Sequence, residues 1–534
     1  MDQPVGRRRR VAAALLPAAL YVAWAASYYV RFGHPAPEVH DEFSYLLAAD
    51  TFARGRLANP SPAFPEFFET FHVNVTPAYV SMYPPGQGLW LALGQVVMGH
   101  AWWGVVLSTA LFVAAVGWAA LAWMGPAWAM GAGFVALSYV LGTYWSTSYW
   151  GGSVAALGGA MALGAFGRLG RAWTGRAADQ RGPAAGLGAV WSAGCVMALL
   201  GRPYEGTVMA VCLALALGWL LLRSPLGKRQ NWQELFRFSA GAVPVAAAGA
   251  LFLMACNHAA TGSPFRLAYI ENARQYQIRR TFHWQSDRPA PVYRHEIFRA
   301  TYEGLLRREM SVARRYTEMG TMFRDHYGSL KLNATGLAAA ALWGGASGLG
   351  WVLGLAAAGL VAVLMVVWVQ PHYYAPFAAS LAVAVAGGAA QAAGRKWLGR
   401  RRAWLVAWIG IGLLAPRFAL LLGRAPDRSR FGWQRAEIAA RLERDGGRHL
   451  VLVRYRPWHD WHAEWVYNGA NLEHAPVLWA RWHQSARLQE FVAHYADRKV
   501  WLLEPDLPGS PLVEWRSGAE VETPPGARPA EERQ

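Results

Sequence analysis

The chain has 534 residues, of which 54% are hydrophobic and only 16% are charged. Soluble proteins carry about 25% charged residues, so this composition excludes an ordinary soluble enzyme. The net charge of +18 would point to nucleic acid in a soluble chain, but here many arginines flank long apolar segments. Such arginines orient helices in a membrane, so we expect a multi-pass membrane protein with no nucleic-acid partner.

About eleven segments are long enough to cross a bilayer, which takes roughly 20 apolar residues. The first, 11–30, follows four arginines and lacks a small-residue cleavage site, so we expect a retained helix with a cytoplasmic N-terminus. Further spans are expected at 102–124, 126–145, 150–169, 184–200, 206–222, 238–256, 334–350, 352–370, 374–393 and 403–422. The Gly-rich block 334–370 fits one long helix or two. The apolar piece 88–99 is too short to span, which predicts a re-entrant or interfacial segment.

The basic residues test this arrangement. If the chain starts inside, three short basic connections fall in the cytoplasm, as the positive-inside rule requires. They contain Arg171, Arg176 and Arg181; Arg223, Lys228 and Arg229; and the arginines and lysine of 395–402. The Ala- and Arg-rich composition is typical of GC-rich bacteria, so we expect a bacterial inner-membrane protein.

Residues 1–422 are expected to form the transmembrane domain, with 31–87 and 257–333 as large loops on the non-cytoplasmic face. Within the second loop, 294–319 has apolar residues at helical spacing between Arg and Glu residues. This pattern predicts an amphipathic helix along the membrane surface.

Residues 423–517 are predicted to form a small α/β domain outside the membrane. Its expected elements are strands at 449–455, 477–480 and 499–503 and a helix at 485–495. This domain either recognises the acceptor or packs beside the large loops. The Pro- and Glu-rich segment 518–534 predicts a disordered tail.

The acidic residues of the first half of the chain gather in the first large loop. The sharpest group is His40, Asp41 and Glu42, about ten residues after the first span. A carboxylate at a membrane surface can take a proton from a sugar or lipid hydroxyl, or can bind a cation. The two acids could equally cap and solvate a surface helix.

Further polar groups stand at the ends of predicted spans on the same face. Two prolines and flanking glycines make 81–88 a rigid turn that contains Tyr83. In the turn 202–206, Arg202 and Glu205 either pair across a hairpin or offer the arginine to a lipid phosphate.

Two later groups lie at the mouths of spans. Arg266 belongs to the first, at 257–269, and His372 and Tyr373 belong to the second, at 371–376. The second group is also typical of an interfacial aromatic belt. His and Asp residues at 459–462 resemble a metal-binding spacing, but without a second ligand pair we interpret them as surface residues.

The first loop resembles that of a known enzyme family. It contains, in order, HDEFSYLLAAD, an FET glutamate and SMYPPGQG. This order resembles the GT-C superfamily of polytopic glycosyltransferases, specifically its bacterial protein mannosyltransferase and aminoarabinose transferase branch. GRPYEG, TGSPFRLAY and PHYYAP are similar to motifs of a bacterial subgroup of that branch. The resemblance covers the chain from about residue 11 to 424.

The resemblance implies a GT-C-like fold and a transfer reaction. A sugar would move, with inversion, from a polyprenyl-phosphate-linked donor to an acceptor hydroxyl on the non-cytoplasmic face. By resemblance Asp41 is the general base, Glu42 orients it or the acceptor, and Glu69 is the second important carboxylate. The acceptor is left open between glycan, lipid and protein.

The resemblance also bears on the donor phosphate. Relatives carry a His or Lys before Pro-Pro, where this chain has Tyr83. In this chain another basic residue at the same face would therefore bind the donor phosphate. The candidates for the donor site are Arg202, Arg266 and His372, with Glu205, Tyr373 and Tyr83 beside them. The scheme requires no cofactor and we assign no metal ligands, although the acidic group could hold a divalent cation.

Two other functions compete with this one. A transporter or flippase for a polyprenyl-linked glycan would place its polar residues near the midplane, whereas here they lie at span ends. A non-catalytic protein that binds lipid or glycan would not need Asp41, Glu42 and Glu69. Both observations favour the glycosyltransferase.

Overall fold

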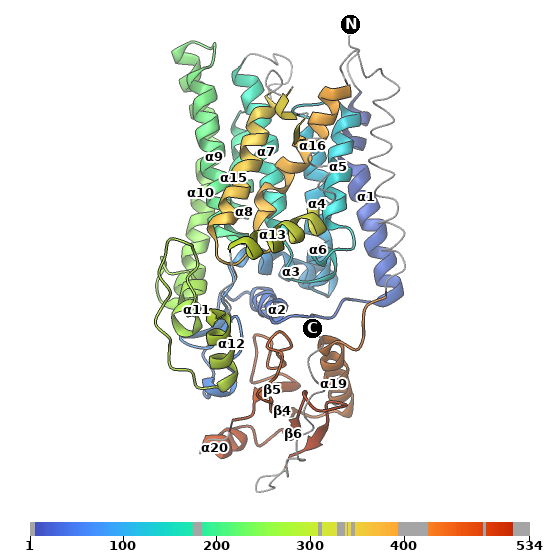
Figure 1. Ribbon diagram of the computed structural model, residues 1–534, viewed down its shortest axis with the longest axis vertical. Helices are drawn as coiled ribbons and strands as arrows, with labels where there is room; N and C mark the ends of the chain where they lie inside the picture. The colour runs from blue at the N-terminus through green and yellow to red at the C-terminus, as the bar shows by residue number, and fades with distance from the viewer. Residues whose placement is uncertain are drawn as a thin grey trace.

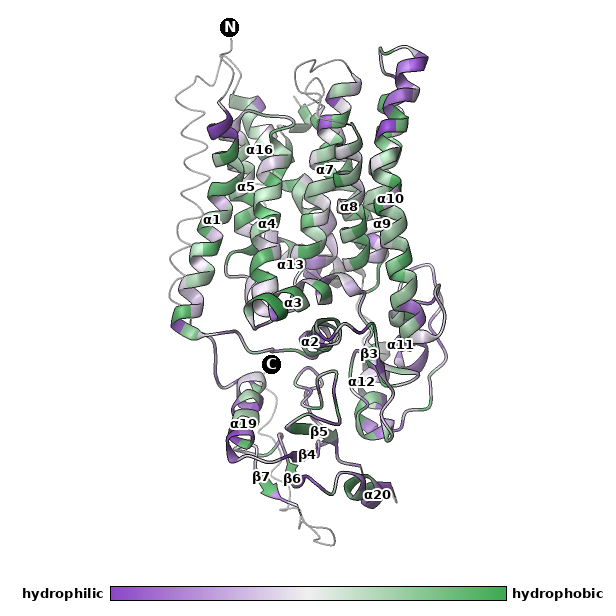
Figure 2. Ribbon diagram, turned by 180° about the vertical axis from the view of Figure 1, so that it is seen from behind, coloured by the Kyte–Doolittle hydropathy of each residue, from purple (hydrophilic) through white to green (hydrophobic). Residues whose placement is uncertain are grey.

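The structure is a computed structural model that describes residues 6–174, 184–307, 312–327, 337–338, 340–342, 348–393, 425–483 and 487–515. Long helices run side by side along the longest axis, and shorter helices and two small sheets lie beyond one end of this bundle (Figure 1). Figure 2 shows that the middle of the bundle is hydrophobic and that hydrophilic residues gather toward both ends and in the region beyond it. We call the end that carries helix α2 (His40–Ala53) the α2 end.

Nine of the eleven predicted spans coincide with apolar helices. Among the described residues, seven helical segments are long and apolar enough to cross a membrane, and two more apolar helices are shorter. The long ones are α1 (Arg7–Phe32), α4 (Trp102–Ala120), α7 (Ser153–Trp173), α8 (Ala184–Gly201), α9 (Pro203–Leu222), α10 (Lys228–Thr261) and the 3₁₀ turn η4 (Pro371–Phe377) with α16 (Ala378–Ala393). The shorter ones are α5 (Pro126–Val140) and α15 (Leu349–Met365). The predicted span 403–422, the basic run 395–402, most of 334–350 and the tail 518–534 lie outside the described residues.

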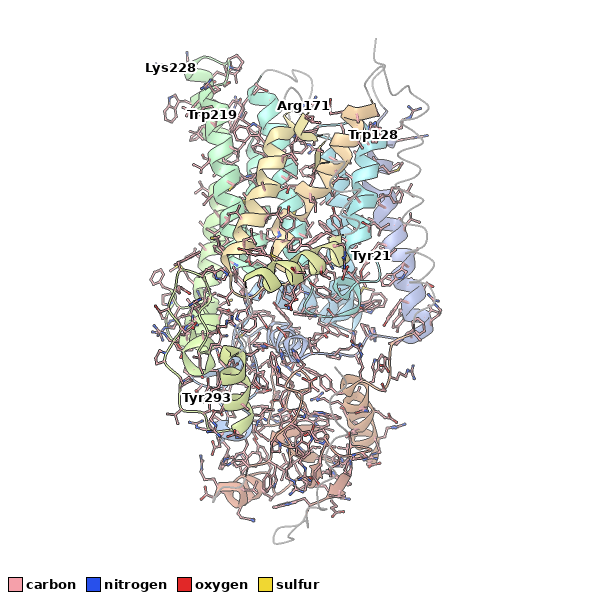
Figure 3. The ribbon with its side chains drawn as sticks, in the orientation of Figure 1. Tyr21, Trp128, Arg171, Trp219, Lys228 and Tyr293 are labelled. Atoms are coloured by element: carbon pink, nitrogen blue, oxygen red, sulfur yellow. The ribbon has the colours of Figure 1, made fainter. Side chains whose placement is uncertain are left out.

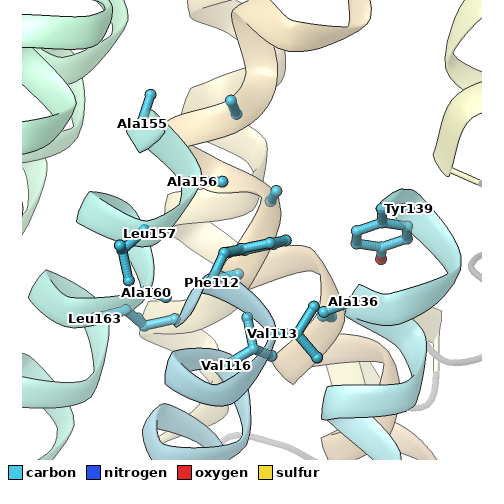
Figure 4. Close-up of a cluster of buried hydrophobic side chains, with 14 of the residues drawn as sticks. Phe112, Val113, Val116, Ala136, Tyr139, Ala155, Ala156, Leu157, Ala160 and Leu163 are labelled. Carbon is cyan, nitrogen blue, oxygen red and sulfur yellow. The ribbon is translucent and has the colours of Figure 1, made fainter. Parts of the chain in front are cut away.

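Small residues let these helices approach closely. Phe112 and Val116 of α4 pack among alanines of α5 and α7 in the core of the bundle (Figure 4). Where α7 meets α8, a Cβ added to Gly158 would lie 2.5 Å from the carbonyl oxygen of Gly194. Close backbone contact of this kind replaces the hydrophobic driving force that helices lack inside a membrane.

Replacing Gly159 by Ala should destabilise the protein by about 1–3 kcal/mol, because the space is already filled. Its new Cβ would lie 1.9 Å from the carbonyl oxygen of Pro376, in η4, and a backbone atom cannot move aside cheaply. Gly218→Ala in α9 is the matched control, since an added Cβ there meets nothing within 4 Å. Thermal unfolding of the purified variants tests this: equal melting temperatures for both would refute the close contact.

Four helices and a small sheet cover the α2 end. α3 (Pro85–Met98) packs against α2 and α4 without spanning, as expected for the interfacial segment 88–99. The first loop forms a sheet in the order β1-β3-β2, with a 3₁₀ turn η1 before β2. The remaining elements are α6 (Tyr144–Thr147), α11 (Ala268–Tyr276), α13 (Val312–Tyr327), η1 (Pro65–Phe67), β1 (Asn59–Pro60), β2 (Val73–Asn74) and β3 (Ala78–Ser81).

The predicted amphipathic stretch 294–319 is helical over most of its described residues. Its first part is α12 (Glu296–Arg307), where Phe298 is buried and Tyr302 nearly so. Both side chains pack on Phe71 of the first loop and on Tyr276. The apolar face of α12 is thus covered by the protein's own loops, a partner that helical periodicity alone does not reveal.

The predicted C-terminal α/β domain is confirmed. Its four-stranded sheet has the order β5-β4-β6-β7, with β4, β5 and β6 parallel and β7 antiparallel to β6. The elements are α19 (Phe431–Asp445), β4 (His449–Val453), β5 (Val477–Arg481), α20 (Arg487–His494), β6 (Lys499–Leu503) and β7 (Leu512–Glu514).

This domain packs beside the first loop rather than apart from it. Phe43 and Leu47 of α2 share one hydrophobic core with Leu450 and Leu478 of the sheet. The ring of Phe43 stacks on Tyr467 at 4.8 Å. The domain therefore helps to hold α2, and with it Asp41, in place.

Candidate functional site

Asp41 lies in the first turn of α2, close to two histidines and a tyrosine. The helix N-terminus favours a carboxylate there. The Tyr83 hydroxyl donates a hydrogen bond to Asp41, and His40 Nδ1 lies 2.7 Å from Asp41 Oδ2. Burial opposes ionisation of Asp41, but the charge of His40 and the hydrogen bonds from His40 and Tyr83 hold the pKa of its carboxyl well below the usual value. A carboxylate that stays ionised at neutral pH can accept a proton or bind a cation.

His72 completes this group and was not identified from the sequence. Its Nε2 lies 3.9 Å from Asp41 Oδ2. The backbone of His72 is in the left-handed region, with φ at 63°, and its carbonyl oxygen accepts a hydrogen bond from Ser44 Oγ at 2.6 Å. Such a conformation persists only where its surroundings enforce it. A histidine three residues after Glu69 was the only signal in the sequence.

The residues present fit a divalent cation. His40, Asp41 and His72 offer ligand atoms that all lie within 4.8 Å of one another. The Nε2 of His40 and the Nδ1 of His72 are buried and have no hydrogen-bond partner in the described part of the chain. Burial lowers the pKa of His72 to about 3, so its imidazole is neutral at pH 7 and can coordinate a metal. Histidine nitrogens, rather than the acidic cluster expected from the sequence, supply most of these ligands.

Glu42 faces away from this group. Its two oxygens accept hydrogen bonds from the backbone N–H groups of Glu38 at 2.8 Å and Tyr149 at 3.0 Å. Burial raises the pKa of Glu42 to about 8. The side chain thus ties the start of α2 to the loop before α7, which is a positioning contact.

Glu69 lies on the other side of the first loop. Its Oε1 accepts a hydrogen bond from Arg294 at 2.9 Å, and its Oε2 is 3.4 Å from His295 Nε2. The three predicted carboxylates therefore occupy different surroundings, and of the three only Asp41 contacts His40 and His72.

Arg202 stands at the α2 end, immediately before α9. Its guanidinium lies over the Tyr373 ring, 4.6 Å from the centroid. No carboxylate of the described residues lies within ion-pair distance of it, so of the two alternatives for this turn the direct Arg202–Glu205 pair is not formed, although Glu205 is buried close enough for the two charges to interact. Burial raises the pKa of Tyr45 to about 12 and the Arg202 charge opposes this rise, which places the guanidinium near α2. A half-buried cation without a carboxylate partner is suited to bind an anion.

The other donor-site candidates have partners within the protein. Arg266 Nη1 lies 3.1 Å from Glu271 Oε2, and His372 Nδ1 lies 2.9 Å from the Tyr144 hydroxyl. Tyr83 stacks on Tyr45 at 4.3 Å while it donates to Asp41. Tyr83 thus acts on the carboxylate rather than on a phosphate.

The spacing at 459–462 does not form a metal site in the structure. His459 Nδ1 lies 2.6 Å from Asp506 Oδ1, and His462 lies 3.0 Å from Asp460. Two residues of this segment reach the Asp41 group, because the rings of Trp461 and His462 stack on His40 at 4.8 Å and 5.5 Å.

Comparison with known proteins finds similarity at the level of the fold. No protein-family model and no curated protein sequence matches the chain. The oligosaccharyltransferase of Archaeoglobus fulgidus, solved with Zn and sulfate, superposes with a TM-score of 0.51 at 15% identity, over 92% of this chain and 67% of that one. ArnT from Cupriavidus metallidurans bound to undecaprenyl phosphate gives a TM-score of 0.48 at 14% identity, over 91% and 92%.

The first of these similarities extends over nearly the whole chain, which includes the helical bundle and the loops at the α2 end. The expected fold class, a helical membrane bundle with a small C-terminal sheet domain, agrees with it. The chain therefore shares its overall fold with this oligosaccharyltransferase.

Proposed function

We propose that the protein is a membrane glycosyltransferase that moves a sugar from a polyprenyl-phosphate-linked donor to an acceptor hydroxyl, with inversion. The observation that carries the proposal is the gathering of Asp41, its two histidines and the cation Arg202 at one end of a GT-C fold. Sugar transfer needs a base for the acceptor hydroxyl and a cation for the departing phosphate. The ionised Asp41 carboxylate suits the first task, and the Arg202 guanidinium suits the second.

Asp41 takes the proton from the acceptor hydroxyl. The oxygen that loses this proton attacks C1 of the sugar, and the bond from C1 to the phosphate oxygen breaks on the opposite face. The Tyr83 hydroxyl holds the Asp41 carboxylate in position, and Glu42 fixes the turn of helix that carries it. Back-side attack with a positioned base gives inversion at C1.

Arg202 binds the phosphate, which leaves with the electron pair of the broken bond. A guanidinium matches phosphate oxygens with two parallel donors, and it stabilises charge as that charge develops.

His40, Asp41 and His72 would hold a divalent cation, if one is bound. Such a cation would polarise the acceptor hydroxyl and lower its pKa. The histidines would then serve as ligands, and Asp41 would lie next to the proton that is removed.

We place the α2 end on the non-cytoplasmic face of a bacterial inner membrane. Arg171 and Lys228 lie at the opposite end of the bundle from Tyr293 (Figure 3). The four arginines that open α1 lie at that opposite end too. By the positive-inside rule this basic end faces the cytoplasm, and the C-terminal domain faces away from it.

Native mass spectrometry of the detergent-purified protein tests the proposed donor without a guess at the sugar. We expect polyprenyl phosphate or its glycosyl ester to remain bound, and the attached mass would identify the sugar. Gly218→Ala, which changes only a helix far from the site, is the control for sample quality. Only bulk phospholipid in well-folded protein, even after incubation with polyprenyl phosphate, would contradict the proposed donor.

A further inference from the structure

A second cavity, of about 900 Å³, lies between α12 and the C-terminal sheet domain. On the sheet side it is lined by Arg454, Tyr455 and Trp482, which directly follow strands β4 and β5. The carboxyl ends of parallel strands form the crevice where open α/β sheets commonly bind ligands. The volume is near the top of the usual range of about 300–1,000 Å³, which is enough for an oligosaccharide.

The cavity wall is rich in arginine, since Arg294, Arg299, Arg454, Arg456 and Arg481 line it. Arg481 is buried, and its Nε and Nη2 groups bond the carbonyl oxygen of Glu69 and the carboxylate of Glu464. Its Nη1 has no partner among the residues described, nor has the Nε of Arg456. Arginine donates and never accepts, so a wall with several arginines favours a ligand rich in acceptor oxygens. Phosphate and carboxylate are the groups that match a guanidinium best.

Aromatic rings complete the lining. Tyr455, Trp461 and Trp482 face the cavity together with the arginines. Flat aromatic faces give a sugar ring its apolar contact, while the arginines take its charged substituent. The combination distinguishes an anionic sugar from a plain inorganic anion, which would need no aromatic wall.

The cavity adjoins the Asp41 group. Trp461, in its wall, stacks on His40 with an angle of 27° between the rings. Arg294 and His295, in the opposite wall, bind Glu69 of the first loop. A saccharide seated in the cavity could therefore extend a hydroxyl past Trp461 toward Asp41.

We propose that this cavity binds the acceptor, and that the acceptor is an anionic saccharide, a glycan that carries phosphate or carboxylate groups. The inference rests on the proposed function and deepens it, since it gives Glu69 and the C-terminal domain a role in holding the acceptor. Arg456 and Arg481 bind its anionic group, and the aromatic residues bind its sugar rings.

Binding to the purified full-length protein tests the proposal with three probes: phosphorylated mannopentaose, tetragalacturonic acid and neutral maltotetraose. We expect at least one anionic probe to bind about 10-fold or more tightly than maltotetraose, and the pair of anionic probes tells phosphate from carboxylate. Arg481→Gln and Arg456→Gln should each weaken that binding about 10-fold or more. Because Arg481 also supports the fold, Arg456→Gln decides the matter if the first variant unfolds.

Arg448→Gln is the matched control. Arg448 belongs to the same domain and pairs with Asp497 at the surface, outside the cavity. Its binding should equal that of the unmodified protein. Equal affinity for anionic and neutral probes, or an unchanged affinity in a folded Arg456→Gln variant, would overturn the proposal.

These outcomes are independent of the proposed donor. Probe binding needs no donor and no turnover. Anionic-probe binding without any polyprenyl phosphate in the protein would refute the donor and keep the cavity as a glycan site. Turnover without probe binding would keep the enzyme and refute the cavity.

Discussion

Replacement of Asp41 by Asn is expected to slow sugar transfer by roughly 10³-fold while the donor stays bound. A positioned general base contributes about 10²–10⁴-fold to a rate, and the amide cannot take the proton. The substitution keeps the size of the side chain and leaves an oxygen that can accept the Tyr83 hydrogen bond. The measurement is the release of polyprenyl phosphate from the bound donor, with native mass spectrometry to confirm that the donor is present.

Glu38→Gln is the matched control for Asp41→Asn. Glu38 lies three residues earlier and pairs with Arg430 in an exposed contact, which is worth about 0–1 kcal/mol. Its turnover should remain within about threefold of the unmodified rate. Transfer at the full rate in Asp41→Asn would rule Asp41 out as the base.

Measuring the metal content of the same proteins distinguishes two roles of Asp41, that of a metal ligand and that of a general base. If a cation is bound and disappears in Asp41→Asn, the carboxylate acts first as a ligand. Loss of turnover with the metal retained would identify it as the base. His72→Gln completes the comparison, since His72 can only serve as a ligand in this scheme.

The fold could be predicted largely from the sequence because its determinants are local. Apolar length gives the spans, as in α8, where the expected 184–200 coincides with Ala184–Gly201. Short apolar runs likewise predicted β4 and β6. The packing partner of the amphipathic stretch at 294–319 could not be predicted from such local signals. Its apolar face is covered by Phe71, more than 200 residues earlier, and periodicity does not identify the partner.

The candidate site was predicted less completely, because it depends on contacts between distant segments. The acidic motif pointed to Asp41, but His72 reaches it only through the turn before β2. Nothing in the sequence marked Arg481 as a functional residue, since it lies within an ordinary buried strand. It lines a cavity only because α12 and the sheet domain meet around that cavity.

The second large effect is expected at Arg202. Arg202→Ala should lower kcat/KM for the donor by about 10²–10³-fold, the cost of removing a preorganised donor from a developing charge. Arg202→Lys should recover part of this loss, because an ammonium keeps the charge and loses the two parallel hydrogen bonds. Steady-state transfer at varied donor concentration measures both variants.

Arg266→Gln is the comparison that makes this prediction specific. Both arginines lie at the α2 end and both come from motifs of the same resemblance, but Arg266 is already bound to Glu271. Its replacement should change kcat/KM by no more than about threefold. If Arg266→Gln is the more damaging variant, the phosphate binds there and the Arg266–Glu271 pair must open when the donor arrives. Because Arg202 has no such pair to break among the described residues, its guanidinium is available to the phosphate without that cost, and this difference is what the two variants measure.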